Sequence, residues 1–136
     1  MKSYSSNLFG AQALIFILMI LSTLKIEAFD IDRFDQNNAF VLGKDLVAMP
    51  YGMQLLEAKN VSADELIIGI HGGNSEGYEW IYPFWQLNKE SNQVFFYRWN
   101  DKRCANANNV ELMNHIDSLI NNYSSVKRIK ILSHSY

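Results

Sequence analysis

Residues 66–70 (LIIGI) form an apolar run in which no polar side chain alternates with the apolar ones. A strand with one face in water alternates apolar and polar residues, whereas a strand covered by helices on both faces is apolar throughout. The run therefore predicts an internal strand of a sheet with helices on both faces. Residues 94–99 (VFFYRW) and 127–132 (KRIKIL) predict two further buried strands.

The segments between these strands predict helices. Within residues 110–123, apolar residues recur at intervals of three and four, which indicates one apolar helix face. They are Leu112, Met113, Ile116, Leu119, Ile120 and Tyr123. Asn108 is a suitable N-cap for this helix, and Pro83 predicts the start of a shorter one, because its missing N–H costs nothing at a first helical position. Strand, helix, strand, helix, strand is typical of an α/β fold with a parallel sheet.

The region before the first buried strand predicts an antiparallel part of the sheet. Residues 39–49 and 53–58 contain enough apolar side chains for two early strands. Residues 43–45 and 50–52 supply turn chemistry around them. Residues 29–38 are polar and predict a surface segment that leads into the domain.

The N-terminal 28 residues predict a signal peptide. Lys2 is followed by an apolar stretch at residues 13–21, and a small residue, Ala28, stands at a plausible cleavage point. The charged residues Lys25 and Glu27 follow soon after, so the apolar stretch is shorter than the roughly 20 residues of a membrane span. We therefore expect residues 1–28 to direct export, to the periplasm or outside the cell, and the only membrane contact expected is an uncleaved form of this segment.

Residues 29–136 are enough for one small domain, and their composition excludes several functions. The formal net charge of the chain is −2, which argues against nucleic-acid binding. Cys104 is the single cysteine, so no internal disulfide can form. His71, His115 and His134 lack the spacing of a zinc site. We predict neither a metal nor a cofactor.

Two short motifs stand directly after predicted strands. They are His71-Gly72-Gly73 and Ser133-His134-Ser135-Tyr136. The second resembles the first four positions of the nucleophile elbow Gly-x-Ser-x-Gly, with Ser133 in place of the first glycine. The first resembles the oxyanion turn that follows an earlier strand of the same fold. Together the motifs and strands resemble the N-terminal portion of the α/β-hydrolase superfamily, in particular serine esterases and lipases, over residues 66–136.

The resemblance implies a set of site residues. Ser135 would be the nucleophile, and the backbone N–H groups of Gly73 and Tyr136 would form the oxyanion hole. His71 and Gly72 would shape the turn, without a catalytic role for His71. From the residues alone, Gly72 and Gly73 are also compatible with a simple tight turn. The substrate implied is a small-molecule or lipid ester.

The resemblance also implies that the catalytic acid and histidine follow Ser135 in the chain, beyond Tyr136. The expected fold is therefore the N-terminal half of an α/β-hydrolase: early antiparallel strands, then parallel strands with crossover helices, truncated at the elbow. We expect a fragment of an exported serine hydrolase that is inactive as the 136-residue chain. Two alternatives stay open: a short non-catalytic exported protein that binds a partner, and a chain completed by a companion chain.

Overall fold

The computed structural model of the protein describes residues 29–134. The predicted signal peptide and residues 135–136 lie outside this range. In chain order the described elements are the 3-10 helix η1 (Ile31–Arg33), α2 (Ala39–Ala48), β1 (Gly52–Leu55), β2 (Glu65–Ile70), α3 (Tyr78–Leu87), β3 (Asn92–Arg98), α4 (Ala105–Asn122) and β4 (Arg128–Ser133). The fold is α/β, with a four-stranded mixed sheet and three α-helices in the described part.

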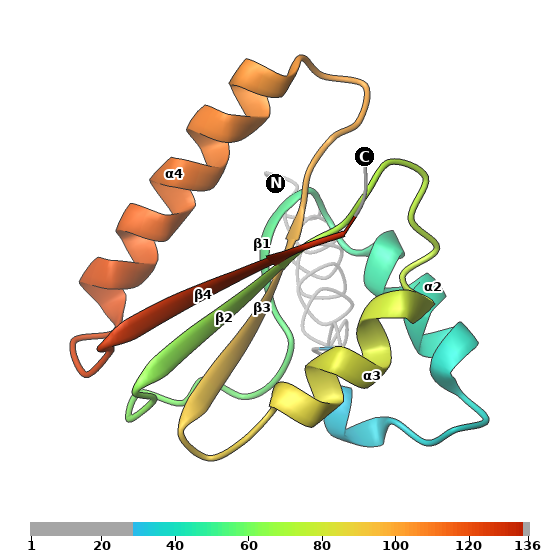
Figure 1. The fold of residues 1–136 in the computed structure, drawn as a ribbon, viewed down its shortest axis with the longest axis horizontal. Helices are drawn as coiled ribbons and strands as arrows, with labels where there is room; N and C mark the ends of the chain where they lie inside the picture. The colour runs from blue at the N-terminus through green and yellow to red at the C-terminus, as the bar shows by residue number, and fades with distance from the viewer. Residues whose placement is uncertain (1–28, 135–136) are drawn as a thin grey trace, which may run out of the picture.

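The strands lie in the order β1-β3-β2-β4 (Figure 1). β2 pairs in parallel with both β3 and β4, and β1 pairs antiparallel with β3. The three strands predicted from apolar runs are thus confirmed as a parallel group. An antiparallel strand, β1, is also present as predicted. It pairs with β3 and not with a second strand from the region before β2.

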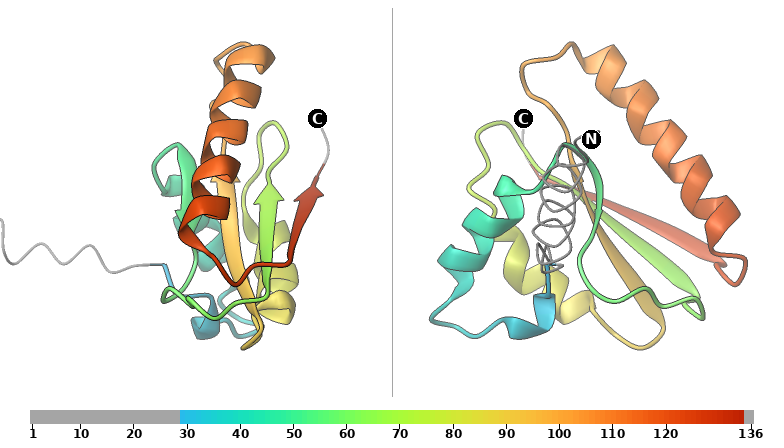
Figure 2. Two further views of the ribbon diagram at one scale, coloured as in Figure 1. Left: turned by 90° about the vertical axis from the view of Figure 1, so that its left-hand side faces the viewer. Right: turned by 180° about the vertical axis from the view of Figure 1, so that it is seen from behind.

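Helices cover both faces of the sheet, with α4 on one face and α2 and α3 on the other (Figures 1 and 2). Successive residues of β2 enter the two cores in turn. Ile67 belongs to the core beneath α2 and α3, whereas Leu66 and Ile68 belong to the core beneath α4. This burial on both faces explains the apolar run without alternation. Gly69 lets the Phe84 ring of α3 pack directly on the backbone of β2, because a Cβ at position 69 would lie 2.3 Å from Cζ of Phe84.

The strand predicted at residues 39–49 is wrong: the segment forms helix α2. Its buried residues, Leu42, Gly43 and Leu46, lie on one helix face. Gly43 lets α2 approach the start of α3 so closely that a Cβ would lie 2.3 Å from the backbone N of Tyr78. A short apolar run fits a helix or a strand, and here contact with α3 decides between them.

The start predicted for α3 is also wrong. The helix begins at Tyr78 and runs through Pro83. Gly77 precedes it with a φ of 83°, in the left-handed region that glycine adopts readily. Trp80, on the N-terminal side of Pro83, and Phe84 are both buried against the sheet. Burial of these rings offsets the backbone hydrogen bond that Pro83 cannot donate.

Helix α4 is confirmed but begins at Ala105, so that Asn108 lies inside its first turns and is not the N-cap. The N-cap is Cys104. Ile116 and Tyr123 of the predicted apolar face are buried, whereas Met113 and Ile120 are 55% and 52% exposed. The apolar stripe is therefore wider than the face that the sheet covers.

The prediction that the last strand is buried is wrong. β4 pairs with β2 on one side, and no other described strand pairs with it. Most of its residues are exposed, and Ile131 is 50% exposed. Its apolar residues resemble those of an internal strand, but β4 lies at an edge of the described sheet and most of its side chains are exposed.

Candidate functional site

The carboxyl ends of the three parallel strands meet at one edge of the sheet. Ile70, the last residue of β2, is level with Tyr97 on β3 and with Ser133 on β4. His71 and His134 follow directly. In open α/β sheets, ligands bind in the crevice outside the carboxyl ends of the strands. The two motifs singled out in the sequence therefore leave adjacent strands at the edge where a ligand site is expected.

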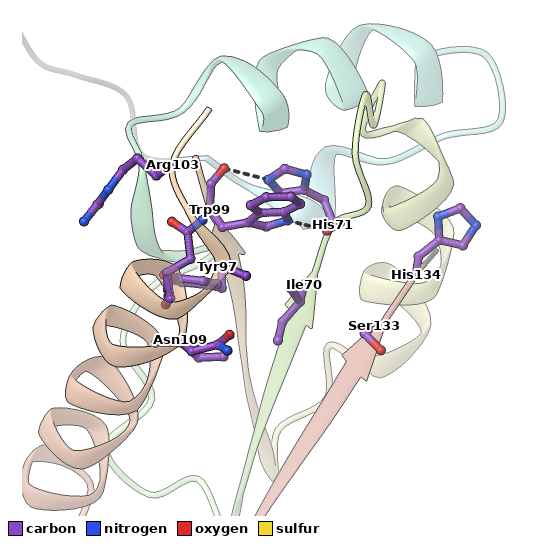
Figure 3. A pocket seen from close by; sticks show the side chains of 11 residues that line it. Ile70, His71, Tyr97, Trp99, Arg103, Asn109, Ser133 and His134 are labelled. Atoms are coloured by element: carbon purple, nitrogen blue, oxygen red, sulfur yellow. Dashed lines mark hydrogen bonds between the residues drawn. The ribbon is translucent and has the colours of Figure 1, made fainter. Parts of the chain in front are cut away.

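His71 connects the turn after β2 to the loop after β3. Its Nδ1 lies 2.7 Å from the Gly72 carbonyl oxygen, and its Nε2 lies 3.2 Å from that of Trp99. In return, Trp99 Nε1 donates to the His71 carbonyl at 2.6 Å, and the two rings stack with centroids 5.4 Å apart (Figure 3). A neutral imidazole has one N–H and donates to one of these carbonyls at a time. The ring is thus held by backbone groups, an arrangement that suits positioning of the turn.

The two glycines of the turn differ in their surroundings. Gly72 is buried, and its carbonyl accepts a hydrogen bond from Ser75 N at 3.4 Å. Gly73 is exposed, and apart from Gly73 and its two chain neighbours no described residue has an atom within 4 Å of a Cβ built on it. The left-handed residue of the turn is Asn74, with a φ of 56°. Neither a tight fit nor a positive φ therefore requires glycine at position 73.

Ser133 and His134 end the described part of the chain. His134 N donates to the Ile70 carbonyl at 3.2 Å, which continues the pairing of β4 with β2 by one residue. The His134 ring lies edge-on to Trp80 of α3, with centroids 6.5 Å apart, and points away from Tyr97 and Asn109 (Figure 3). Ser135 and Tyr136, the predicted nucleophile and oxyanion-hole residue, lie outside the described residues.

A cavity of about 380 Å³ lies at this edge, between the strand ends and the start of α4. That volume is within the range of small-molecule sites. Its lining residues are Ile70, His71, Tyr97, Trp99, Arg103, Ala105, Asn108, Asn109, Leu112, Ser133 and His134 (Figure 3). Of these residues, His71 was predicted for the site from the sequence. The lining residues of β3 and α4 were not predicted, although the rule about the carboxyl ends of parallel strands points to the region after β3.

The polar groups of the cavity are mostly engaged. Tyr97 OH donates to the Asn108 backbone carbonyl at 2.9 Å. Burial raises the pKa of the Tyr97 phenol, and the Glu111 carboxylate adds to the effect, so the hydroxyl remains a neutral donor. Arg103 Nη1 forms an ion pair with Glu111 Oε2 at 2.6 Å. His115 does not line the cavity, and its ring lies 6.0 Å from that of Tyr97, centroid to centroid.

Residues 29–134 contain no group of three His, Cys, Asp or Glu side chains that could hold a metal ion. Within the same range, no helix has the length and apolar character needed to cross a bilayer.

No protein-family model matches the chain, and neither a curated protein nor a solved structure does.

Proposed function

We propose that the chain is the N-terminal part of an exported serine hydrolase that acts on carboxylic esters, with Ser135 as the nucleophile. The observation that carries this proposal is the level pairing of β2 with β4, Ile70 opposite Ser133. Neighbouring strands lie about 4.8 Å apart. The His71-Gly72-Gly73 turn and His134, the last described residue before Ser135, therefore leave the sheet from adjacent strands.

The arrangement supports ester chemistry because the two motifs would contribute different groups to one reaction. A serine hydroxyl after β4 attacks the ester carbonyl. Backbone N–H groups, one from Gly73 and one from Tyr136, stabilise the oxyanion that forms. A Cβ built on Gly73 would meet no atom within 4 Å other than those of its chain neighbours, so the turn is open on that side. The adjoining cavity would hold one end of the ester.

The base needed by Ser135 is not evident among the described histidines. The His71 ring lies between two carbonyl oxygens and donates to one of them, the His134 ring packs beside Trp80, and His115 lies outside the cavity. As in the resembling enzymes, we propose that an acid and a histidine from beyond Tyr136 complete the site. The isolated 136-residue chain would then be inactive.

Labelling with a fluorophosphonate tests the proposal, because this probe forms an adduct with an activated serine. The protein would be tagged after residue 28 at its own locus and purified from its source with any companion chain. We expect an adduct on Ser135 that Ser135→Ala removes and Ser133→Ala retains. No adduct in the purified protein, or one that persists in Ser135→Ala, would contradict the proposal.

The alternative, a non-catalytic protein that binds a partner, is favoured by one surface feature. Four large apolar side chains on α4 and β4 are at least half exposed: Val110, Met113, Ile120 and Ile131. Exposed apolar groups of this kind mark interaction surfaces when they are contiguous. In the same purification, a stoichiometric companion chain without any serine adduct would favour this alternative.

A further inference from the structure

Two segments of the chain match Asn-x-Ser, the acceptor sequence for N-linked glycans in exported proteins. They are Asn60-Val61-Ser62 and Asn122-Tyr123-Ser124. Such triplets also arise by chance, so the structure around each asparagine has to be compared. A glycan is bulky and polar, and it is compatible with a surface position. The two asparagines differ in whether the folded chain has room for one.

The Asn60 amide is held at both ends. Its Nδ2 donates to the Glu90 carbonyl at 2.7 Å, and its Oδ1 accepts from Ser62 N at 3.0 Å. The second contact is an Asx turn, in which the side chain of Asn bonds to the backbone two residues on. Asn60 N also donates to Oε1 of Gln93, a fully buried residue of β3. These contacts attach the first acceptor sequence to the start of β3.

A glycan on Asn60 conflicts with this arrangement. It would replace one of the two hydrogens of Nδ2 and add bulk beside the Glu90 carbonyl, which lies 2.7 Å away. The same turn is also fixed by Ser125, whose Oγ lies 2.9 Å from the carbonyl oxygens of both Val61 and Ala63. The turn is therefore tied on two sides and cannot move away from β3 without losing these contacts.

Asn122 lies in different surroundings. It is the last residue of α4 and is exposed. Its Nδ2 donates to Ser118 of the same helix, at 2.8 Å to the backbone carbonyl oxygen. Tyr123 is 4% exposed and belongs to the core beneath α4, whereas Ser124 is exposed in the turn that follows. The buried ring thus fixes the middle of the second acceptor sequence and leaves its Asn and Ser at the surface.

A glycan on Asn122 would leave the candidate site open. The turn between α4 and β4 lies at the amino end of β4, whereas the cavity lies at the carboxyl ends of the strands (Figure 1). Ile120, on the exposed apolar flank of α4, is two residues away from Asn122. An α-helix turns by about 100° per residue, so the two side chains are about 200° apart around the helix axis. The glycan would therefore leave this flank uncovered as well.

We propose that Asn122, and not Asn60, carries an N-linked glycan. The sugar donor is a lipid-linked oligosaccharide pyrophosphate. The bond from C1 of the first sugar to the pyrophosphate oxygen breaks, a C1–Nδ2 bond forms, and Nδ2 loses one proton as the lipid pyrophosphate leaves. The inference rests on the export that is part of the proposed function, and it adds a modification site away from the proposed chemistry.

Mass spectrometry of the protein purified from its source tests the inference, in the same sample that is labelled with the fluorophosphonate. An amidase that removes N-linked glycans is applied in ¹⁸O-labelled water, so that each glycosylated asparagine becomes an ¹⁸O-labelled aspartate. A sample without the amidase controls for spontaneous deamidation. Tryptic cleavage places Asn60, Asn122 and Ser135 on three separate peptides. We expect the label at Asn122 and none at Asn60.

Matched variants locate the glycan. Asn122→Gln and Ser124→Ala should each lose it, because each removes one part of the acceptor sequence. Ser124→Thr keeps the hydroxyl and should retain the glycan, as should Asn60→Gln. If the first two variants do not accumulate, the peptides of the native protein still decide. Label at neither asparagine, at Asn60 alone or at both, or a glycan that persists in Asn122→Gln, would overturn the inference.

The two proposals fail in different ways. A serine adduct together with an unmodified Asn122 would refute the glycan alone. A glycan on Asn122 without any serine adduct would refute the hydrolase and retain the modification site.

Discussion

At the residue scale, Glu65 shows how a buried charge is held in the sheet. Its side chain is 5% exposed, and its carboxylate oxygens lie 2.8 Å from Lys130 Nζ and 2.9 Å from Arg128 Nε. The hydrogen bond from Lys130 lowers the pKa of Glu65 most; burial opposes this, and Arg128 lowers the pKa further. Both cations come from β4. The carboxylate therefore connects the edge strand to β2.

We expect Glu65→Gln to lower the urea midpoint of unfolding at neutral pH. The folded pKa of Glu65 is below its usual value of 4.5, so its contribution is present above that value and lost as the pH falls through the folded pKa. The difference between the two proteins should shrink in acid. Glu90→Gln, at an exposed position, is the control. Urea titrations from pH 7 downwards measure both, and a difference independent of pH would contradict this account.

At the element scale, α2 shows how contact with a neighbour selects one structure for an ambiguous segment. Its glycine contacts the backbone at the start of α3, and Leu46 is fully buried in the core between these helices and the sheet. Val41, on the same helix, is 59% exposed. As a result, two aliphatic residues five positions apart make very different contributions to stability.

We expect Leu46→Ala to destabilise the protein by about 2–5 kcal/mol, because it leaves a cavity in a packed core. Val41→Ala should change the free energy of unfolding by roughly 0.5 kcal/mol or less, as exposed positions do. Chemical denaturation followed by circular dichroism measures both. Similar losses for the two variants would show that α2 does not pack as described.

At the scale of the whole molecule, the described sheet has a protected centre, β2 and β3, and two edge strands, β1 and β4. β2 and β3 have a strand on each side, whereas β4 pairs with β2 alone among the described strands. Residues 66–69 of β2 are buried, and most residues of β4 are exposed. The free energy needed to open a segment locally follows such differences in burial and pairing.

Amide hydrogen exchange should therefore be slowest in β2 and β3 and clearly faster in β4. Mass spectrometry of the full chain at two protein concentrations measures this order. Equal protection of β4 and β2 at the lower concentration would contradict the arrangement. Protection of β4 that appears only at the higher concentration would show that a second copy pairs with this edge.

The sequence alone determined the three parallel strands, the antiparallel strand near residue 53, the helix after β3, and the motifs that follow β2 and β4. These signals are local, because an apolar run or a repeat of three and four depends on neighbouring residues alone. Only the tertiary structure decided that residues 39–48 are helical, that α3 passes through Pro83, that β4 is exposed and that Asn108 lines a cavity. Each of these depends on which distant residues supply the contacts: the start of α3 for Gly43, the sheet for Phe84, and the strand ends for Asn108. For β4 it depends on the fact that, among the described strands, only β2 pairs with it. Burial is a property of the packed chain, and no local pattern encodes it fully.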